Sequence, residues 1–68
     1  MKYAVVYEQA PQNWAAYVPD LPGCVATGRT RAAVQRRIRE AIGLHLGAIR
    51  DKGERVPEMS ATVEVVEV

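Results

Sequence analysis

Residues 18–30 read VPDLPGCVATGRT and bring together two prolines, two glycines, an aspartate and the only cysteine of the chain. Each proline fixes its own backbone φ and drives the preceding residue toward extended geometry. Gly23 can adopt the positive φ that tight turns often require. The stretch therefore predicts a rigid turn between two strands. Its structural residues are Pro19, Asp20, Pro22 and Gly23.

Strand-forming residues lie on both sides of this turn. Residues 2–8 (KYAVVYE) and 14–18 (WAAYV) contain β-branched and aromatic residues, and the intervening QAPQN is typical of a turn, so we expect a hairpin. Residues 24–28 (CVATG) predict a short third strand. MSATVEVVEV, at residues 59–68, contains a fourth. Alternation in that strand places Val63 and Val65 on one face and Val66 and Val68 on the other.

A single amphipathic helix is predicted from about Arg31 to Lys52. Thr30 is a good N-cap, Gly53 is a natural C-cap, and Pro57 follows shortly after. Apolar residues and one histidine recur between them at helical spacing: Val34, Ile38, Ala41, Ile42, His45 and Ile49. The expected fold is α+β, in the order β-β-β-α-β, with the helix packed on one face of the sheet. We expect residues 1–68 to form one small domain, with no separate DNA-binding domain.

The size of the chain favours support from another chain. Sixty-eight residues bury only roughly 60% of the unfolded surface, and a lone cysteine excludes an internal disulfide. One helix covers one sheet face, yet strand one is apolar on both. We therefore expect a homo-oligomer or a partner contact, for which the candidate interface residues are Tyr3, Val5, Tyr7, Gly43 and Gly47. No signal peptide or membrane span is indicated, so we expect a cytoplasmic protein and no membrane partner.

Positive charge is concentrated near the start of the predicted helix, although the formal net charge is only +1. Five arginines lie within eleven residues that contain no acid: Arg29, Arg31, Arg36, Arg37 and Arg39. One interpretation is a stand-alone oligomeric module that binds nucleic acid through them. The other is a solvated surface, which we favour because these side chains point in different directions around a helix and no aromatic residue interleaves with them.

Catalysis is not expected from this sequence. Asp20 lacks the converging carboxylates that metal-assisted hydrolysis needs, because the other acids are scattered. Cys24 and His45 suggest a nucleophile and its base. We favour another explanation, in which Cys24 is a small apolar residue at the start of a strand and His45 is a core histidine on the apolar stripe of the helix. We therefore predict no catalytic, cofactor or metal site. A degenerate nuclease with residual activity is the least favoured alternative.

The segments VPDLPGCVATGRT and EAIGLHLGAIRDKGERVPE resemble the N-terminal domain of HicB family antitoxins. The resemblance covers almost the whole chain. It implies a partial RNase H-like fold and a non-catalytic role, which is to hold a HicA-type toxin, a small ribonuclease that cuts messenger RNA, in an inactive complex. Many family members carry a second, DNA-binding domain, and they tend to be acidic after the threonine cap. Here the chain stops at Val68 and that cap is followed by RAAVQRRIRE.

Overall fold

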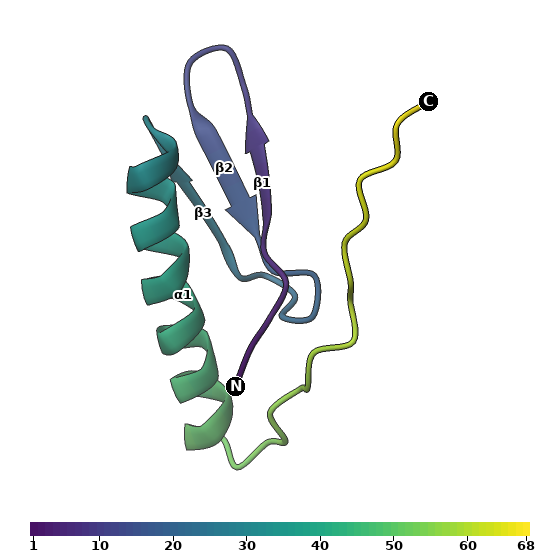
Figure 1. Cartoon of the computed structure of the whole chain (residues 1–68). Coiled ribbons are helices and arrows are strands. Elements are labelled where there is room, and N and C mark those ends of the chain that lie inside the picture. The colour runs from purple at the N-terminus through teal and green to yellow at the C-terminus, as the bar shows by residue number, and fades with distance from the viewer.

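Three short strands and one long helix form the regular structure of the computed structural model, which describes residues 1–68 (Figure 1). The strands are β1 (Val6–Gln9), β2 (Trp14–Tyr17) and β3 (Val25–Gly28), and the helix is α1 (Arg31–Asp51). The sheet is antiparallel in the order β1-β2-β3. The α+β class and the first four elements are therefore as the sequence predicts.

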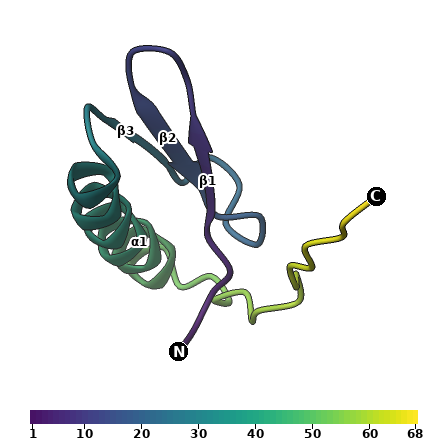
Figure 2. The same ribbon diagram turned by 45° about the horizontal axis from the view of Figure 1, so that its top comes forward.

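The register of the sheet assigns its two faces. Val6 lies opposite Tyr17, which lies opposite Val25, and these three form one row across the sheet. The neighbouring row consists of Tyr7, Ala16 and Ala26. Ala16 is buried and the other two members of its row pack against the core, so this second row faces α1. Because side chains alternate along a strand, the Val6 row faces away from the helix. Figure 2 shows α1 on one side of the sheet only.

Both ends of α1 are closed by the residues that the sequence indicates. Thr30 has extended backbone angles, and its hydroxyl accepts a hydrogen bond from the backbone N–H of Ala33 at 3.0 Å. At the other end Gly53 has φ of 70°. Its N–H donates to the carbonyl of Arg50, and the N–H of Glu54 donates to that of Ile49. This pair of bonds is a Schellman motif, which satisfies carbonyls that the helix leaves unpaired.

The hydrophobic core lies between α1, the inner face of the sheet and the loop that follows β2. Its fully buried side chains are few: Ala16, Val18, Leu21, Cys24, Val34, Ile38 and Leu46. Val34 and Ile38 belong to the predicted apolar stripe of the helix. Leu46 does not, and it is more buried than Ile49, which the stripe included. A core of this size makes each buried side chain a large share of the total stability.

The predicted fourth strand is not confirmed. Residues 54–68 form no ladder with any strand, and most of their side chains are exposed. In Figure 1 this C-terminal segment leaves the end of α1, crosses below the sheet and runs upward apart from it. β-branched residues favour extended backbone, but a strand is stable only when it finds a hydrogen-bonding partner. The RNase H-like arrangement, which needs that strand, is likewise not confirmed.

The first strand is shorter than the predicted residues 2–8, because its partner ends early. Val6 pairs with Tyr17, and the chain then turns inward at the buried Val18. Residues 2–5 therefore lie beyond the reach of β2 and continue without a ladder.

Candidate functional site

The loop after β2 is built around a buried leucine. Val18 and Cys24 close the loop through a backbone hydrogen bond of 3.1 Å, and two further backbone bonds run from Leu21 to Val18 and from Cys24 to Leu21. Gly23 has φ of 84°, which an L residue rarely adopts. Leu21 is 0% exposed. The turn therefore does two things, since it reverses the chain and inserts a side chain into the core.

Asp20 fastens the C-terminal segment to this loop. One carboxylate oxygen accepts hydrogen bonds from the backbone N–H groups of Ser60 and Ala61, both at 3.1 Å. The other accepts from the Ser60 hydroxyl at 2.6 Å. The Ser60 hydroxyl, followed by the Ala61 amide, lowers the pKa of Asp20, because these donors favour the charged carboxylate. Both oxygens of the group are therefore engaged in holding residues forty positions away.

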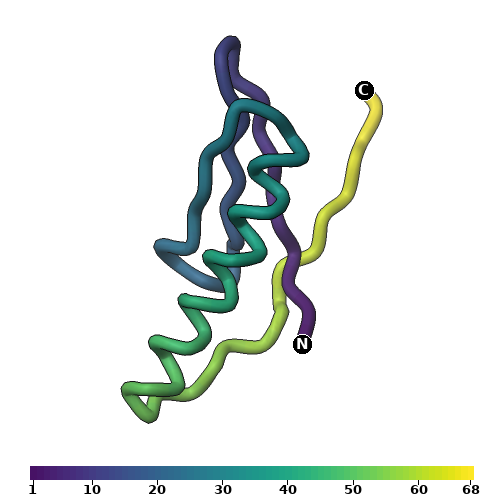
Figure 3. The backbone as a smooth tube through the Cα atoms, turned by 90° about the vertical axis from the view of Figure 1, so that its left-hand side faces the viewer, coloured from purple at the N-terminus to yellow at the C-terminus, as the bar shows by residue number.

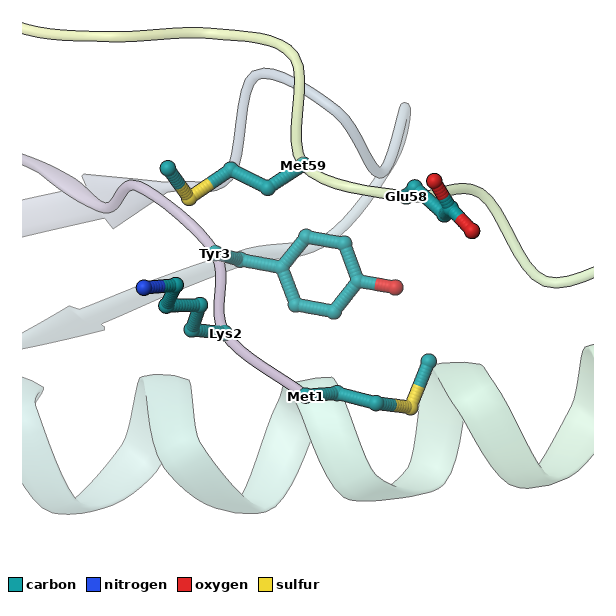
Figure 4. A pocket seen from close by; sticks show the side chains of 5 residues that line it. All are labelled: Met1, Lys2, Tyr3, Glu58 and Met59. Carbon is teal, nitrogen blue, oxygen red and sulfur yellow. The ribbon is translucent and has the colours of Figure 1, made fainter.

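Tyr3 provides a second attachment for the same segment. Its hydroxyl donates a hydrogen bond to the carbonyl of Pro57. Figure 4 shows the Tyr3 ring reaching from the N-terminal segment toward the C-terminal one, with Met59 on one side and Met1 on the other. A shallow cavity of about 250 Å³ lies here, lined by Met1, Lys2, Tyr3, Glu58 and Met59. The two chain ends are therefore packed together at residues 1–3 and 57–59.

The structure divides the predicted interface residues between two places. Tyr3, Val5 and Tyr7 are half-buried and pack against the core on the helix side of the sheet. The outward apolar surface is instead the row of Val6, Tyr17 and Val25, which we call the outer row. Tyr17 is 39% exposed and Val25 is 62% exposed. The alternation was visible in the sequence, but which face the helix would cover was not.

Gly43 is exposed on α1, and Gly47, one turn further along, is half-buried. A Cβ added at either position meets no atom within 4 Å. Their neighbour Leu44 is 77% exposed. This part of α1 is therefore an open surface that combines small residues with one large apolar side chain.

The arginine cluster is not one continuous patch. Arg31 stacks over the rings of Tyr7 and Trp14, with 4.6 and 5.7 Å from its guanidinium carbon to the two ring centres. Arg37 donates to the carbonyl of Thr27 at 2.9 Å. Arg37 and Arg29 line a polar hollow of about 420 Å³ near the hairpin turn, together with Gln12, Asn13, Thr27 and Gly28.

A different hollow contains the remaining two arginines. Arg36 and Arg39 lie beside Ala32 and Gln35 in a depression of about 260 Å³ on the helix. The structure thus pairs Arg29 with Arg37 and Arg36 with Arg39. Arg31 belongs to neither pair, because it covers the aromatic residues of the first two strands.

Cys24 is buried at the start of β3 and belongs to the hydrophobic core. Burial raises the pKa of its thiol, because the charged thiolate is poorly solvated there. His45 is half-buried on the helix. The described chain contains no group of three or more histidine, cysteine, aspartate or glutamate side chains placed to hold a metal ion. Its one helix does not contain a stretch that is long and apolar enough to span a bilayer.

Comparison with known proteins places this domain among the proteins of bacterial toxin–antitoxin systems. Residues 3–67 match the family of HicB-like antitoxins, and the chain belongs to that family. The Thermoplasma acidophilum UPF0150 protein Ta0767 is 31% identical over 90% of this chain and 90% of its own length. A UPF0150 protein of Helicobacter pylori is 43% identical over 62% of this chain and 58% of its own.

A protein of Haemophilus phage HP1, described as an uncharacterized 14.9 kDa protein in the rep-hol intergenic region, is 29% identical over 85% of this chain. The present chain spans only 44% of that phage protein. No solved structure matches the chain at a significant level.

Proposed function

We propose that this chain is the antitoxin of a toxin–antitoxin pair and that it binds and inhibits a HicA-type, RNA-cleaving toxin without catalysing a reaction itself. The family match over residues 3–67 carries the proposal. Since such a toxin acts on messenger RNA, we expect the complex in the cytoplasm. Asp20, the acid in the most distinctive loop, is already bound by Ser60 and Ala61, which supports a structural role for it.

The outer row supplies a suitable surface for a protein partner. Val6, Tyr17 and Val25 form an apolar strip on the face of the sheet that α1 leaves uncovered. Aromatic residues at the centre of such a strip commonly contribute much of the binding free energy of an interface. A toxin seated there would lose access to RNA because the antitoxin occupies its surface, and no chemistry by the antitoxin is needed.

The test uses the gene next to this one, where we expect a short, basic, histidine-containing reading frame. Co-expressed, the two proteins should purify together, and the antitoxin should stop the partner from cleaving RNA in vitro. Tyr17→Lys with Val25→Lys should abolish both effects. Leu44→Lys is the matched control, because Leu44 is an apolar residue on α1 that is even more exposed than Tyr17 and Val25, and this variant should bind normally. RNA cleavage that persists at excess antitoxin contradicts the proposal.

The polar hollow near the hairpin turn favours a second candidate function, which is binding of nucleic acid. Arg29 and Arg37 there meet amide side chains, and phosphates suit such a combination. Against it, Arg37 already bonds to Thr27 and Arg31 already stacks on aromatic rings. A mobility-shift titration decides between the two. We expect weak binding that vanishes at physiological salt, whereas tight binding that survives it and is lost on Arg29→Ala with Arg37→Ala supports this second function.

A further inference from the structure

We propose that residues 62–68 of one copy pair with the open edge of β1 in a second copy, so that the fourth strand of each sheet comes from another chain. The proposal concerns contacts between antitoxin copies and is independent of toxin binding. Three features of the molecule support it: one open sheet edge, one unpaired strand-forming segment, and an anchor that fixes where the segment starts.

The two edges of the sheet differ in how well they are covered. At β3 the Arg37 side chain donates a hydrogen bond of 2.9 Å to the backbone carbonyl of Thr27. β1 is the other edge of the sheet, and Figure 1 shows it on the side away from α1. Its outward backbone groups are therefore free to bond an added strand, as exposed edges readily do.

Residues 62–68 (TVEVVEV) have the composition of a strand but lack a partner. Valines alternate over both faces of this segment, and Val65 is 94% exposed. Beside β1, the segment would place Val63 and Val65 over one sheet face and Val66 and Val68 over the other. Such pairing would bury side chains that a single chain leaves in water. The hydrophobic effect thus favours the same pairing that the unpaired backbone groups of β1 favour.

Hydrogen bonds hold the residues just before this segment, whereas residues 62–68 pair with no strand. The carbonyl of Pro57 accepts a hydrogen bond from the Tyr3 hydroxyl, and the backbone N–H groups of Ser60 and Ala61 donate to the Asp20 carboxylate. Beyond Ala61 the chain runs in the same direction as β1, as Figures 1 and 3 show, but it makes no ladder with it. Because the segment is attached at residues 57–61 and unpaired after them, residues 62–68 can reach the β1 edge of a second copy. Such exchange is a low-cost route to a dimer.

Charge at this edge is mixed. Residues 56–68 contain three glutamates and no lysine or arginine. Arg31 stacks over Tyr7 of β1 and Lys2 precedes the strand, whereas Glu8 lies within the strand. The segment would therefore meet positive charge at Lys2 and Arg31 and like charge at Glu8.

The first test measures self-association of the full chain by sedimentation at micromolar concentration. The native chain should form dimers or larger species. Val65→Pro removes a ladder donor and should raise the dissociation constant about tenfold or more. The matched control Val65→Thr keeps a β-branched side chain and should self-associate like the native chain. The circular dichroism spectrum of each monomer should be unchanged. A native chain that stays monomeric, or a Val65→Pro chain that associates as tightly as the native one, overturns the proposal.

The second test separates exchange between chains from pairing within one chain. A chain with Glu8→Cys in β1 is mixed with a tagged chain carrying Glu64→Cys and is oxidised gently. Exchange predicts a mixed disulfide between the two chains, because paired strands bring the sulfurs within reach. Glu58→Cys, which lies between the attachments at Pro57 and Ser60, is the control that should not cross-link to β1. In a chain carrying both Glu8→Cys and Glu64→Cys, a predominant intrachain disulfide shows pairing within one molecule and overturns the proposal.

Discussion

The loop at residues 18–24 and the segment at residues 62–68 both carry strong local signals, but only the first is structured within the single chain. The loop has prolines and a glycine whose backbone preferences act within a few residues, and its three backbone hydrogen bonds close among those same residues. The C-terminal segment has β-branched residues, whose preference is realised only through a ladder with a distant strand. A local signal therefore determines structure when its partners are also local.

This comparison extends to the rest of the chain. Thr30 and Gly53 end the helix where the sequence predicts, because each cap bonds to atoms within a turn of helix. The attachment of Asp20 to Ser60 could not be predicted, since nothing in either neighbourhood indicates the other. The same holds for Leu21, whose position between two prolines suggests a loop and not the core.

The candidate surfaces were predictable only in part for the same reason. The sequence shows two apolar faces on the first strand, but the choice of the Val6 row as the outer one depends on where α1 packs. The five arginines lie at three places on the surface. Their separation into Arg29 with Arg37 and Arg36 with Arg39 depends on how close the hairpin turn comes to the helix, which no local pattern encodes.

The largest expected effect tests the contrast between loop and segment directly. Leu21→Ala should destabilise the fold by about 2–5 kcal/mol, because it removes a fully buried side chain and leaves a cavity. Val65→Ala, an exposed residue, should change the stability by no more than about 0.5 kcal/mol. Urea unfolding of both variants, at concentrations where each is monomeric, measures the difference. Similar losses at the two positions would break the comparison and would show that residues 62–68 are part of the single-chain core.

Glycine-to-alanine substitutions should change the stability by an intermediate amount. Gly28→Ala should cost about 1–3 kcal/mol, because the added Cβ lies 2.9 Å from a backbone nitrogen that cannot move freely. Gly43→Ala with Gly47→Ala should instead add about 1–2 kcal/mol, since both positions are open and alanine favours a helix. Thermal unfolding measures all three changes. If the double variant gains stability but self-associates less tightly than the native chain, another copy approaches this helix surface closely.

The smallest expected effect concerns Asp20, which connects the two regions. Its hydrogen bonds with Ser60 and Ala61 lower its pKa in the folded chain, so they stabilise the attachment above the usual aspartate range and are lost as the pH falls through the lowered value. In NMR spectra, the amide signals of Ser60 and Ala61 should titrate below pH about 4. In Asp20→Asn the chemical shifts of these two amides should be typical of a detached segment at every pH.

Two observations separate the attachment from a general effect of acid. Glu58→Gln, in the same segment but outside the attachment, should leave the titration of Ser60 and Ala61 unchanged. The amide of Ile38, in the core, should not follow the same curve in any variant. If the Ser60 signal titrates at the ordinary aspartate pKa, or still titrates in Asp20→Asn, the attachment is not what fixes residues 60–61. The loop would then have no hold on the C-terminal segment, and the start of the exchanging strand would have to be fixed at Pro57 alone.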